Sequence, residues 1–229
     1  GVRFPLGPPK NMRKVAIIEN IHQDGIDLLK NNQEFDFEII DDTSEENLIK
    51  VLPNFDACTL RVSKLNEKIM SNCKNLKVIS RHGVGYDNVD LNYIKKNNIT
   101  LLITATANAI SVAEHVICMM LALSKKINQY DQEVRHGNFK KNSSSIESLE
   151  LFNKEILIVG FGRIGQCLIK RCLGFEMKVK VYDPFVSKEI IEKFGGEKFE
   201  DFDKGLKTCD FLTLHVPLNK ETKNLINYS

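Results

Sequence analysis

Short apolar runs alternate with amphipathic stretches along the first half of this chain. Residues typical of β-strands form five runs, at 15–19, 35–40, 57–62, 76–80 and 99–104. Apolar residues recur at helical spacing in the intervening segments, near 22–31, 44–51, 65–73 and 87–97. Strands that alternate with helices connect through right-handed crossovers, so this order predicts a parallel, doubly wound sheet.

The same alternation returns in the last third of the chain. Strands are predicted at 155–160, 178–183 and 210–216, and helices at 163–173, 187–194 and 201–207. Before this block, Ser111 and Glu114 have the spacing of a capping box, which predicts a helix from about Val112 to Lys125. The polar stretch 127–150 is expected to be a connector. We therefore expect an α/β protein divided into a leader or tag at 1–13, a first domain at 14–106, a linking segment at 107–150 and a second domain at 151–229.

Composition excludes several classes of partner. The 229 residues carry 32 basic and 30 acidic side chains, without a basic stripe of the kind that nucleic acids require. The longest apolar segment, near 112–123, contains Glu114 and His115 and is too short to span a bilayer. The six cysteines are scattered singly, without the paired spacing of a metal site. We expect a cytoplasmic protein that binds neither nucleic acid, membrane nor metal.

One glycine cluster has the spacing of a dinucleotide-binding turn. Gly160, Gly162 and Gly165 follow a predicted strand and open a predicted helix. Asp183 ends the next strand, where its carboxylate would accept hydrogen bonds from a ribose diol and repel a 2′-phosphate. This context predicts NAD as the cofactor.

A second glycine cluster, SRHGVGYDNVD at 80–90, also follows a predicted strand. Its amides would form an anion nest around Gly83 and Gly85, with charge supplied by Arg61 and Arg81. The alternative is a simple turn with a helix cap at Asp87. The residues alone do not choose between the two.

The chain contains the motifs RHGVGYDNVD, ANAISVAEH (107–115), GFGRIG, YDP (182–184) and HVPL with Thr222. Through these motifs it resembles the D-isomer-specific 2-hydroxyacid dehydrogenases, and most closely the 3-phosphoglycerate dehydrogenase branch. The resemblance implies a flavodoxin-like substrate domain at 14–106 and an interdomain helix with a dimerisation segment at 107–150. It also implies an incomplete Rossmann NAD domain at 151–229. The chain departs from the family pattern at TATAN (104–108), where TPGAN is usual.

The resemblance also implies roles for individual residues. Substrate binding is implied for Arg61, Ser63, Arg81, Gly83, Val84 and Gly85. Cofactor binding is implied for Val84, Gly160, Gly162, Arg163, Ile164, Gly165, Asp183, His215, Val216, Pro217 and Thr222.

The catalytic residues implied by the resemblance are an arginine, a glutamate and a histidine downstream of HVPL, beyond Ser229. We therefore expect no catalytic residue within the sequence and no acid–base role for His215. The implied substrate is a phosphorylated 2-hydroxy or 2-keto acid, with 3-phosphoglycerate and 3-phosphohydroxypyruvate favoured and a homodimer expected. Alternatives are a glyoxylate or hydroxypyruvate reductase, a non-catalytic NAD-binding regulator and an inactive fragment.

Overall fold

The computed structural model describes residues 12–104, 106–138, 140 and 146–227. By its internal contacts the chain forms two compact units, Gly1–Ala105 and Thr106–Ser229. Most of the expected leader or tag, and part of the expected connector, lie outside the described residues. None of the helices in the described ranges is long and apolar enough to cross a membrane.

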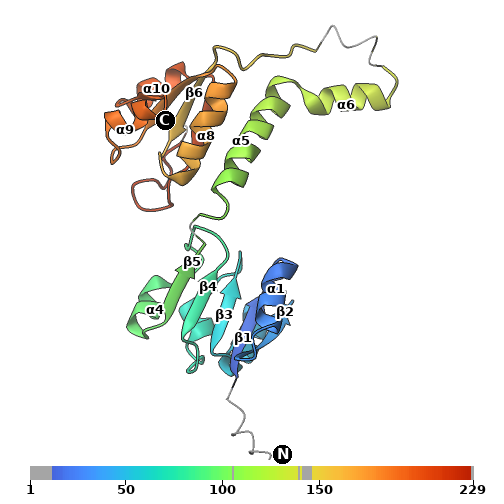
Figure 1. Ribbon diagram of the computed structural model, residues 1–229, viewed down its shortest axis with the longest axis vertical. Coiled ribbons are helices and arrows are strands. Elements are labelled where there is room, and N and C mark those ends of the chain that lie inside the picture. The colour runs from blue at the N-terminus through green and yellow to red at the C-terminus, as the bar shows by residue number, and fades with distance from the viewer. Residues whose placement is uncertain (1–11, 105, 139, 141–145, 228–229) are drawn as a thin grey trace, which may run out of the picture. The chain divides into compact units, whose positions relative to one another are not determined.

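The first unit is built on a parallel five-stranded sheet in the order β2-β1-β3-β4-β5 (Figure 1). Its strands are β1 Arg13–Ile18, β2 Phe35–Ile40, β3 Ala57–Leu60, β4 Val78–Arg81 and β5 Thr100–Ile103. Its helices are α1 Gln23–Lys30, α2 Glu45–Val51, the 3-10 turn η1 Leu52–Asn54, α3 Glu67–Met70 and α4 Leu91–Lys96. This is the flavodoxin-like strand order, which confirms the predicted fold class.

The interior strand β1 of this sheet is buried along most of its length. The last four residues of β1, from Val15 to Ile18, are all buried, as expected for a strand covered on both faces. Side-chain caps then fix where the helices begin. Ser44, Asn66 and Asp90 each accept an amide hydrogen bond from the first turn of α2, α3 and α4. The cap suggested at Asp87 is therefore wrong, because α4 begins later and Asp90 caps it.

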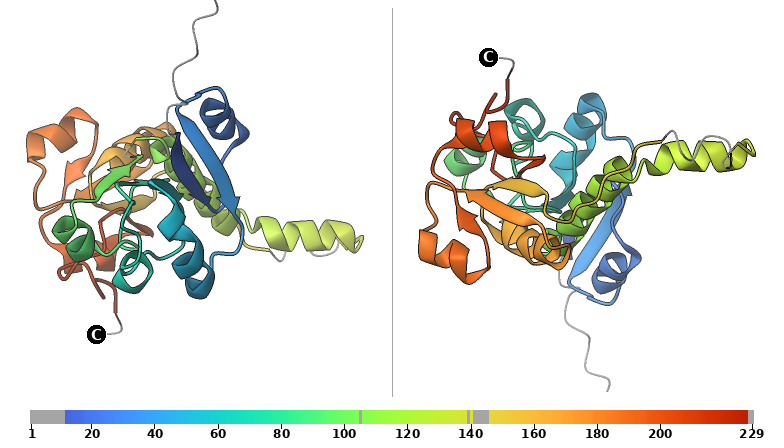
Figure 2. Two further views of the ribbon diagram at one scale, coloured as in Figure 1. Left: turned by 90° about the horizontal axis from the view of Figure 1, so that it is seen from below. Right: turned by 90° about the horizontal axis from the view of Figure 1, so that it is seen from above.

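The second unit contains a parallel four-stranded sheet in the order β8-β7-β6-β9. Its strands are β6 Glu155–Val159, β7 Lys178–Tyr182, β8 Glu197–Lys198 and β9 Phe211–Leu214. Its helices include α5 Ala109–Ser124, α6 Ile127–Arg135, α8 Arg163–Gly174, α9 Lys188–Lys193 and α10 Phe202–Thr208, and α5 packs against α8 (Figure 2). The order corresponds to four strands of a Rossmann sheet.

The expected start of the interdomain helix is wrong. The helix α5 begins at Ala109 after Asn108, so Ser111 lies inside it and forms no capping box with Glu114. Burial of Ala109 and Ala113 accounts for the earlier start, because their packing in the core stabilises an additional helical turn. Glu114 instead pairs with Arg171 of α8 at 2.9 Å. The stretch expected to be connector contains the helix α6, none of whose residues is buried.

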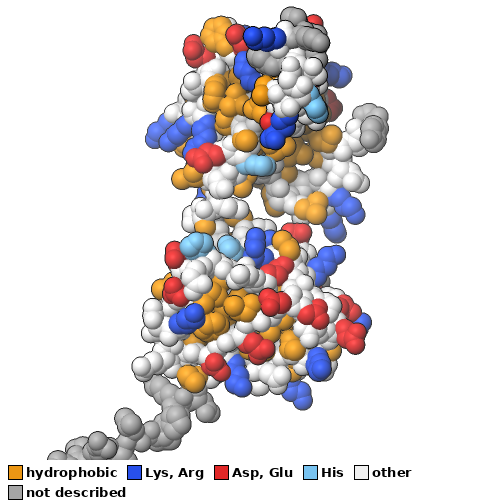
Figure 3. Space-filling view, turned by 90° about the vertical axis from the view of Figure 1, so that its right-hand side faces the viewer, with side chains coloured by type: hydrophobic (Ala, Val, Ile, Leu, Met, Phe, Trp, Pro, Cys, Tyr) orange, Lys and Arg blue, Asp and Glu red, His pale blue; other side chains and the backbone are white. Residues whose placement is uncertain are grey.

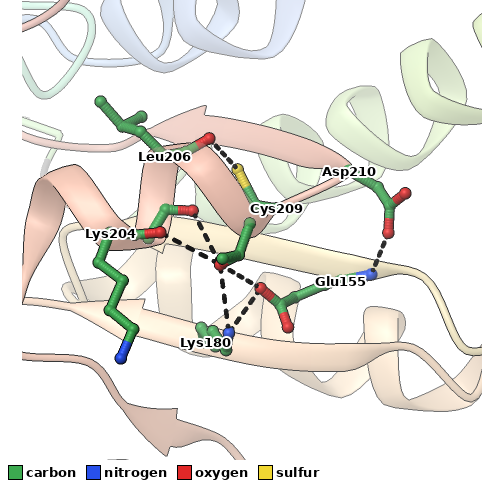
Figure 4. A network of polar contacts seen from close by, with 8 residues as sticks. Glu155, Lys180, Lys204, Leu206, Cys209 and Asp210 are labelled. Carbon is green, nitrogen blue, oxygen red and sulfur yellow. Dashed lines mark hydrogen bonds and ion pairs between the residues drawn. The ribbon is translucent and has the colours of Figure 1, made fainter.

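A polar network joins β6, β7 and α10 at the end of the second sheet opposite Gly160 (Figure 4). Lys180 pairs with Glu155 at 2.6 Å, and the two side chains are only 15% and 18% exposed. The Lys180 ammonium also lies 4.5 Å from the centre of the Phe199 ring. Asp210 accepts the Glu155 amide at 2.8 Å, and this hydrogen bond holds the pKa of the Asp210 carboxyl below its usual value. The network fixes the register of β6 against its neighbours.

Candidate functional site

The turn after β6 requires glycine at its first position. Gly160 has a φ of +95°, and its amide donates to the Tyr182 carbonyl at 2.9 Å. A Cβ at this position would lie 2.5 Å from the carbonyl oxygen of His215. Both the backbone conformation and the close approach of β9 therefore exclude a side chain.

The other two glycines of the cluster have different surroundings. A Cβ on Gly165 would lie 2.5 Å from the Gly160 oxygen, so this glycine lets α8 pack against the strand. A Cβ on Gly162 would meet nothing within 4 Å. Gly162 is the N-cap of α8 and makes no side-chain cap, and the first amides of the helix point out beside it. The open space beside a helix N-terminus suits the pyrophosphate of a dinucleotide, so these residues fit NAD.

Asp183 is fixed next to this turn. One carboxylate oxygen accepts the Phe161 amide and the other accepts the Phe185 amide, both at 2.8 Å. Each oxygen keeps a second lone pair for a further donor. The carboxylate is thus oriented by backbone contacts and retains the capacity to accept two hydroxyl groups.

Residues after β9 border the turn on its other side. The His215 amide donates to the Val159 carbonyl at 2.8 Å, and the His215 Nε2 lies 3.0 Å from the Thr213 hydroxyl. Partial burial lowers the pKa of His215, which favours its neutral form. Thr222 accepts the Asn219 amide and donates to the Pro217 carbonyl, so it closes the turn after Pro217. Arg163 and Pro217 are exposed, and Ile164 and Val216 are half-buried.

The two arginines of the first unit lie on paired strands. Leu60 is in register with Arg81, the last residue of β4, and Arg61 follows Leu60 directly. Both arginines therefore stand at the carboxyl edge of the sheet, where doubly wound proteins bind ligands. Arg61 is exposed, whereas the guanidinium of Arg81 folds back and donates to the His82 carbonyl.

The glycine loop after β4 presents only some of its amides. Gly83 has a φ of +146°, and a Cβ there would overlap the Arg81 guanidinium. Its amide donates to the Thr104 hydroxyl at 2.7 Å, and its carbonyl accepts the Thr104 amide at 3.1 Å. The amides of Val84 and Gly85 make no hydrogen bond within the described residues. These two amides, next to Gly83, are available to an anion.

The apolar and glycine patterns do not single out Glu19, Asn88 or Thr104, yet all three hold loops at this edge. Glu19 and Thr104 directly follow strands β1 and β5. The rule that ligands lie at the carboxyl ends of parallel strands, applied to every strand, would have found these two.

Comparison with known proteins decides the family. Residues 117–229 match the family model described as the D-isomer specific 2-hydroxyacid dehydrogenase, NAD binding domain. The chain is 33% identical over 215 residues to a hydroxypyruvate reductase of Thermotoga maritima, covering 93% of this chain and 68% of that protein. The chain belongs to the D-isomer specific 2-hydroxyacid dehydrogenase family. The predicted resemblance is confirmed, and NAD is the cofactor of this family's second domain.

Other members of this family are more similar in sequence but much longer. A D-3-phosphoglycerate dehydrogenase of Archaeoglobus fulgidus is 39% identical over 214 residues, covering 93% of this chain but only 40% of that protein. The chain thus spans about two fifths of the length of such relatives. A solved structure of an NAD-dependent formate dehydrogenase from Staphylococcus aureus in complex with NAD matches with a TM-score of 0.80 at 28% identity, covering 93% of this chain and 67% of that one.

Proposed function

We propose that the protein is an NAD-dependent dehydrogenase that interconverts D-3-phosphoglycerate and 3-phosphohydroxypyruvate. The observation that carries the proposal is the pair Arg61 and Arg81 on adjacent strand ends, because two guanidinium groups suit a phosphate. The relatives named D-3-phosphoglycerate dehydrogenase support it. All six cysteines are free thiols, which is consistent with work in the cytoplasm.

In this proposal each unit has its own task. NAD, when bound, exchanges a hydride with carbon 2 of the substrate. The second unit holds the pyrophosphate at the start of α8 and the ribose at Asp183, with Val216 and Pro217 beside the adenosine. In the first unit, the amides of Val84 and Gly85 bind the substrate carboxylate, and Arg61, Arg81 and Ser63 surround its phosphate. His215 lines the cofactor and takes no part in proton transfer.

Steady-state kinetics of the intact protein test the substrate. We expect 3-phosphohydroxypyruvate to be reduced with NADH more efficiently than hydroxypyruvate. The double variant Arg61→Ala with Arg81→Ala would lower kcat/KM for the phosphorylated substrate by about a hundredfold and leave hydroxypyruvate reduction nearly unchanged. Lys64→Ala, which removes an exposed neighbouring charge, is the matched control. Equal losses for both substrates would contradict a phosphate-binding role.

A reductase of hydroxypyruvate or glyoxylate is the second candidate. It is favoured by the relative from Thermotoga maritima and by a glyoxylate reductase of Pyrococcus furiosus that is 31% identical. Under this alternative the wild-type protein would prefer the unphosphorylated keto acid, and the same assay distinguishes the two.

We also propose a homodimer formed through α5 and α6. Figure 3 shows hydrophobic side chains on the surface of both units, with charged side chains among them. Large apolar side chains of these helices that are at least half exposed are Ile110, Met119, Leu123, Ile127 and Val134. Sedimentation should give a dimer that Leu123→Glu converts to a monomer, because a buried unpaired carboxylate disfavours association. A wild-type monomer at micromolar concentration would contradict this.

A further inference from the structure

Glu19, the residue after β1, has an unusual backbone and an unusual set of contacts. Its φ is +66°, a left-handed conformation that side-chain-bearing residues seldom adopt. Its carboxylate accepts three successive amides of the loop after β3: Arg61 at 2.8 Å, Val62 at 2.8 Å and Ser63 at 3.2 Å. Strained residues of this kind persist where the surroundings require their geometry, and they are frequent at ligand sites.

Asn88 holds the same loop from the other side. Its side-chain amide donates to the Arg61 carbonyl at 3.1 Å and to the Ser63 carbonyl at 2.7 Å. The backbone of residues 61–63 is thus bound at its amides by a carboxylate and at its carbonyls by an amide. We call this arrangement of Glu19, Asn88 and the loop the arginine-loop clamp.

The clamp lies at the topological switch point of the first sheet. Strands β1 and β3 are neighbours, but β1 leads to β2 on one side and β3 leads to β4 on the other. Ligands of doubly wound sheets bind where the connections diverge in this way. Three consecutive amides there would make a nest for an anion, and here the protein's own carboxylate fills it.

Filling the nest has two consequences for a bound anion. The amides of residues 61–63 are no longer available to it, so the loop can offer only the Arg61 guanidinium and the Ser63 hydroxyl. The rigid backbone also restricts where Arg61 can reach, which lowers the entropy lost when the side chain engages a ligand.

We propose that Glu19 is a positioning residue for substrate specificity. By clamping residues 61–63 it directs Arg61 to the phosphate of a phosphorylated 2-keto acid and prevents the loop from binding other anions through its backbone. Asn88 completes the same clamp. This inference rests on the proposed function, because it takes Arg61 to be the phosphate ligand.

The test compares two substrates that differ only in the phosphate, in the intact protein with NADH. For Glu19→Gln we expect KM for 3-phosphohydroxypyruvate to rise about tenfold while kcat changes less than about twofold. KM for hydroxypyruvate should stay within about twofold of wild type. Asp56→Asn is the matched control, because Asp56 accepts the Lys14 amide at 2.8 Å at the opposite end of the same strands. That variant should leave the ratio of the two KM values unchanged.

Two further variants keep the inference testable if Glu19→Gln fails to fold. Glu19→Gly removes the carboxylate but suits the left-handed backbone. Asn88→Ala removes the other half of the clamp. Both variants should shift the ratio of the KM values for the two substrates as Glu19→Gln does. Equal changes for both substrates, or none, in a folded variant would overturn the role of Glu19. A wild-type protein without preference for the phosphorylated substrate would instead overturn the proposed function.

Discussion

The amide of Phe161 donates a 2.8 Å hydrogen bond to the carboxylate of Asp183. This contact joins the glycine turn after β6 to the end of β7, so the two parts of the dinucleotide fingerprint form one structural unit. The second Asp183 oxygen is engaged in the same way by the Phe185 amide. The geometry that would receive a ribose is therefore set by backbone contacts of the folded domain itself.

Gly162 and Gly165 should differ in what their replacement does. Gly162→Ala places a methyl group in open space, so we expect an unchanged melting temperature but NADH affinity reduced about tenfold or more, because the methyl occupies the pyrophosphate's approach. Gly165→Ala forces a contact with the Gly160 carbonyl and should lower stability as well. Thermal melting and NADH fluorescence titration measure both effects. Gly174→Ala, whose Cβ also meets nothing, is the control and should leave affinity intact. Unchanged NADH affinity in Gly162→Ala would contradict the assignment.

Lys180→Met should destabilise the second unit by about 2 kcal/mol, because it leaves the largely buried Glu155 carboxylate without its cation. Urea denaturation measures the difference. Lys188→Met breaks the exposed pair with Glu192 and should cost less than about 0.5 kcal/mol. Similar losses in the two variants would show that burial of the Lys180 pair has no energetic consequence.

His215 should make stability depend on pH in the mildly acidic range. Its pKa is lowered from 6.5 in the folded state by burial, so below that pH the unfolded chain takes up the proton first. The contribution of neutral His215 to the free energy of unfolding is fully present above about pH 6.5. It is lost as the pH falls towards the folded-state pKa. The urea midpoint should therefore drop less between pH 7.5 and pH 5.5 in His215→Gln than in wild type. His136→Gln, at an exposed position, should behave like wild type in this comparison.

Thiol labelling should separate the cysteines by burial. Desolvation raises the pKa of Cys58 and of Cys172 to about 12, so neither forms the reactive thiolate at neutral pH. Mass spectrometry after brief alkylation of the Leu123→Glu variant, in which the proposed dimer would be disrupted, should find Cys118, which is exposed, modified first. Modification of Cys58 before global unfolding would indicate that the hydrophobic core of the first unit unfolds locally.

The sequence predicted most strands because the buried ones are continuous apolar runs, as in β1 and β6. It missed β8, whose two residues, Glu197 and Lys198, carry no apolar pattern. It also misplaced the start of α5, because burial of Ala109 depends on contacts that local spacing does not encode. The glycine fingerprint could be recognised in the sequence because its parts lie close together along the chain. The arginine-loop clamp could not be recognised, because Glu19 and Arg61 are 42 residues apart.

The first sheet takes all five of its strands from residues 13–103, and the second takes its four from residues 155–214. Within the described chain, neither sheet contains a strand from the other unit. During synthesis, the whole first sheet, with the arginine-loop clamp, leaves the ribosome before the glycine turn has been translated. All five strands of the first sheet can therefore pair as the chain emerges, before the strands of the second sheet have been completed.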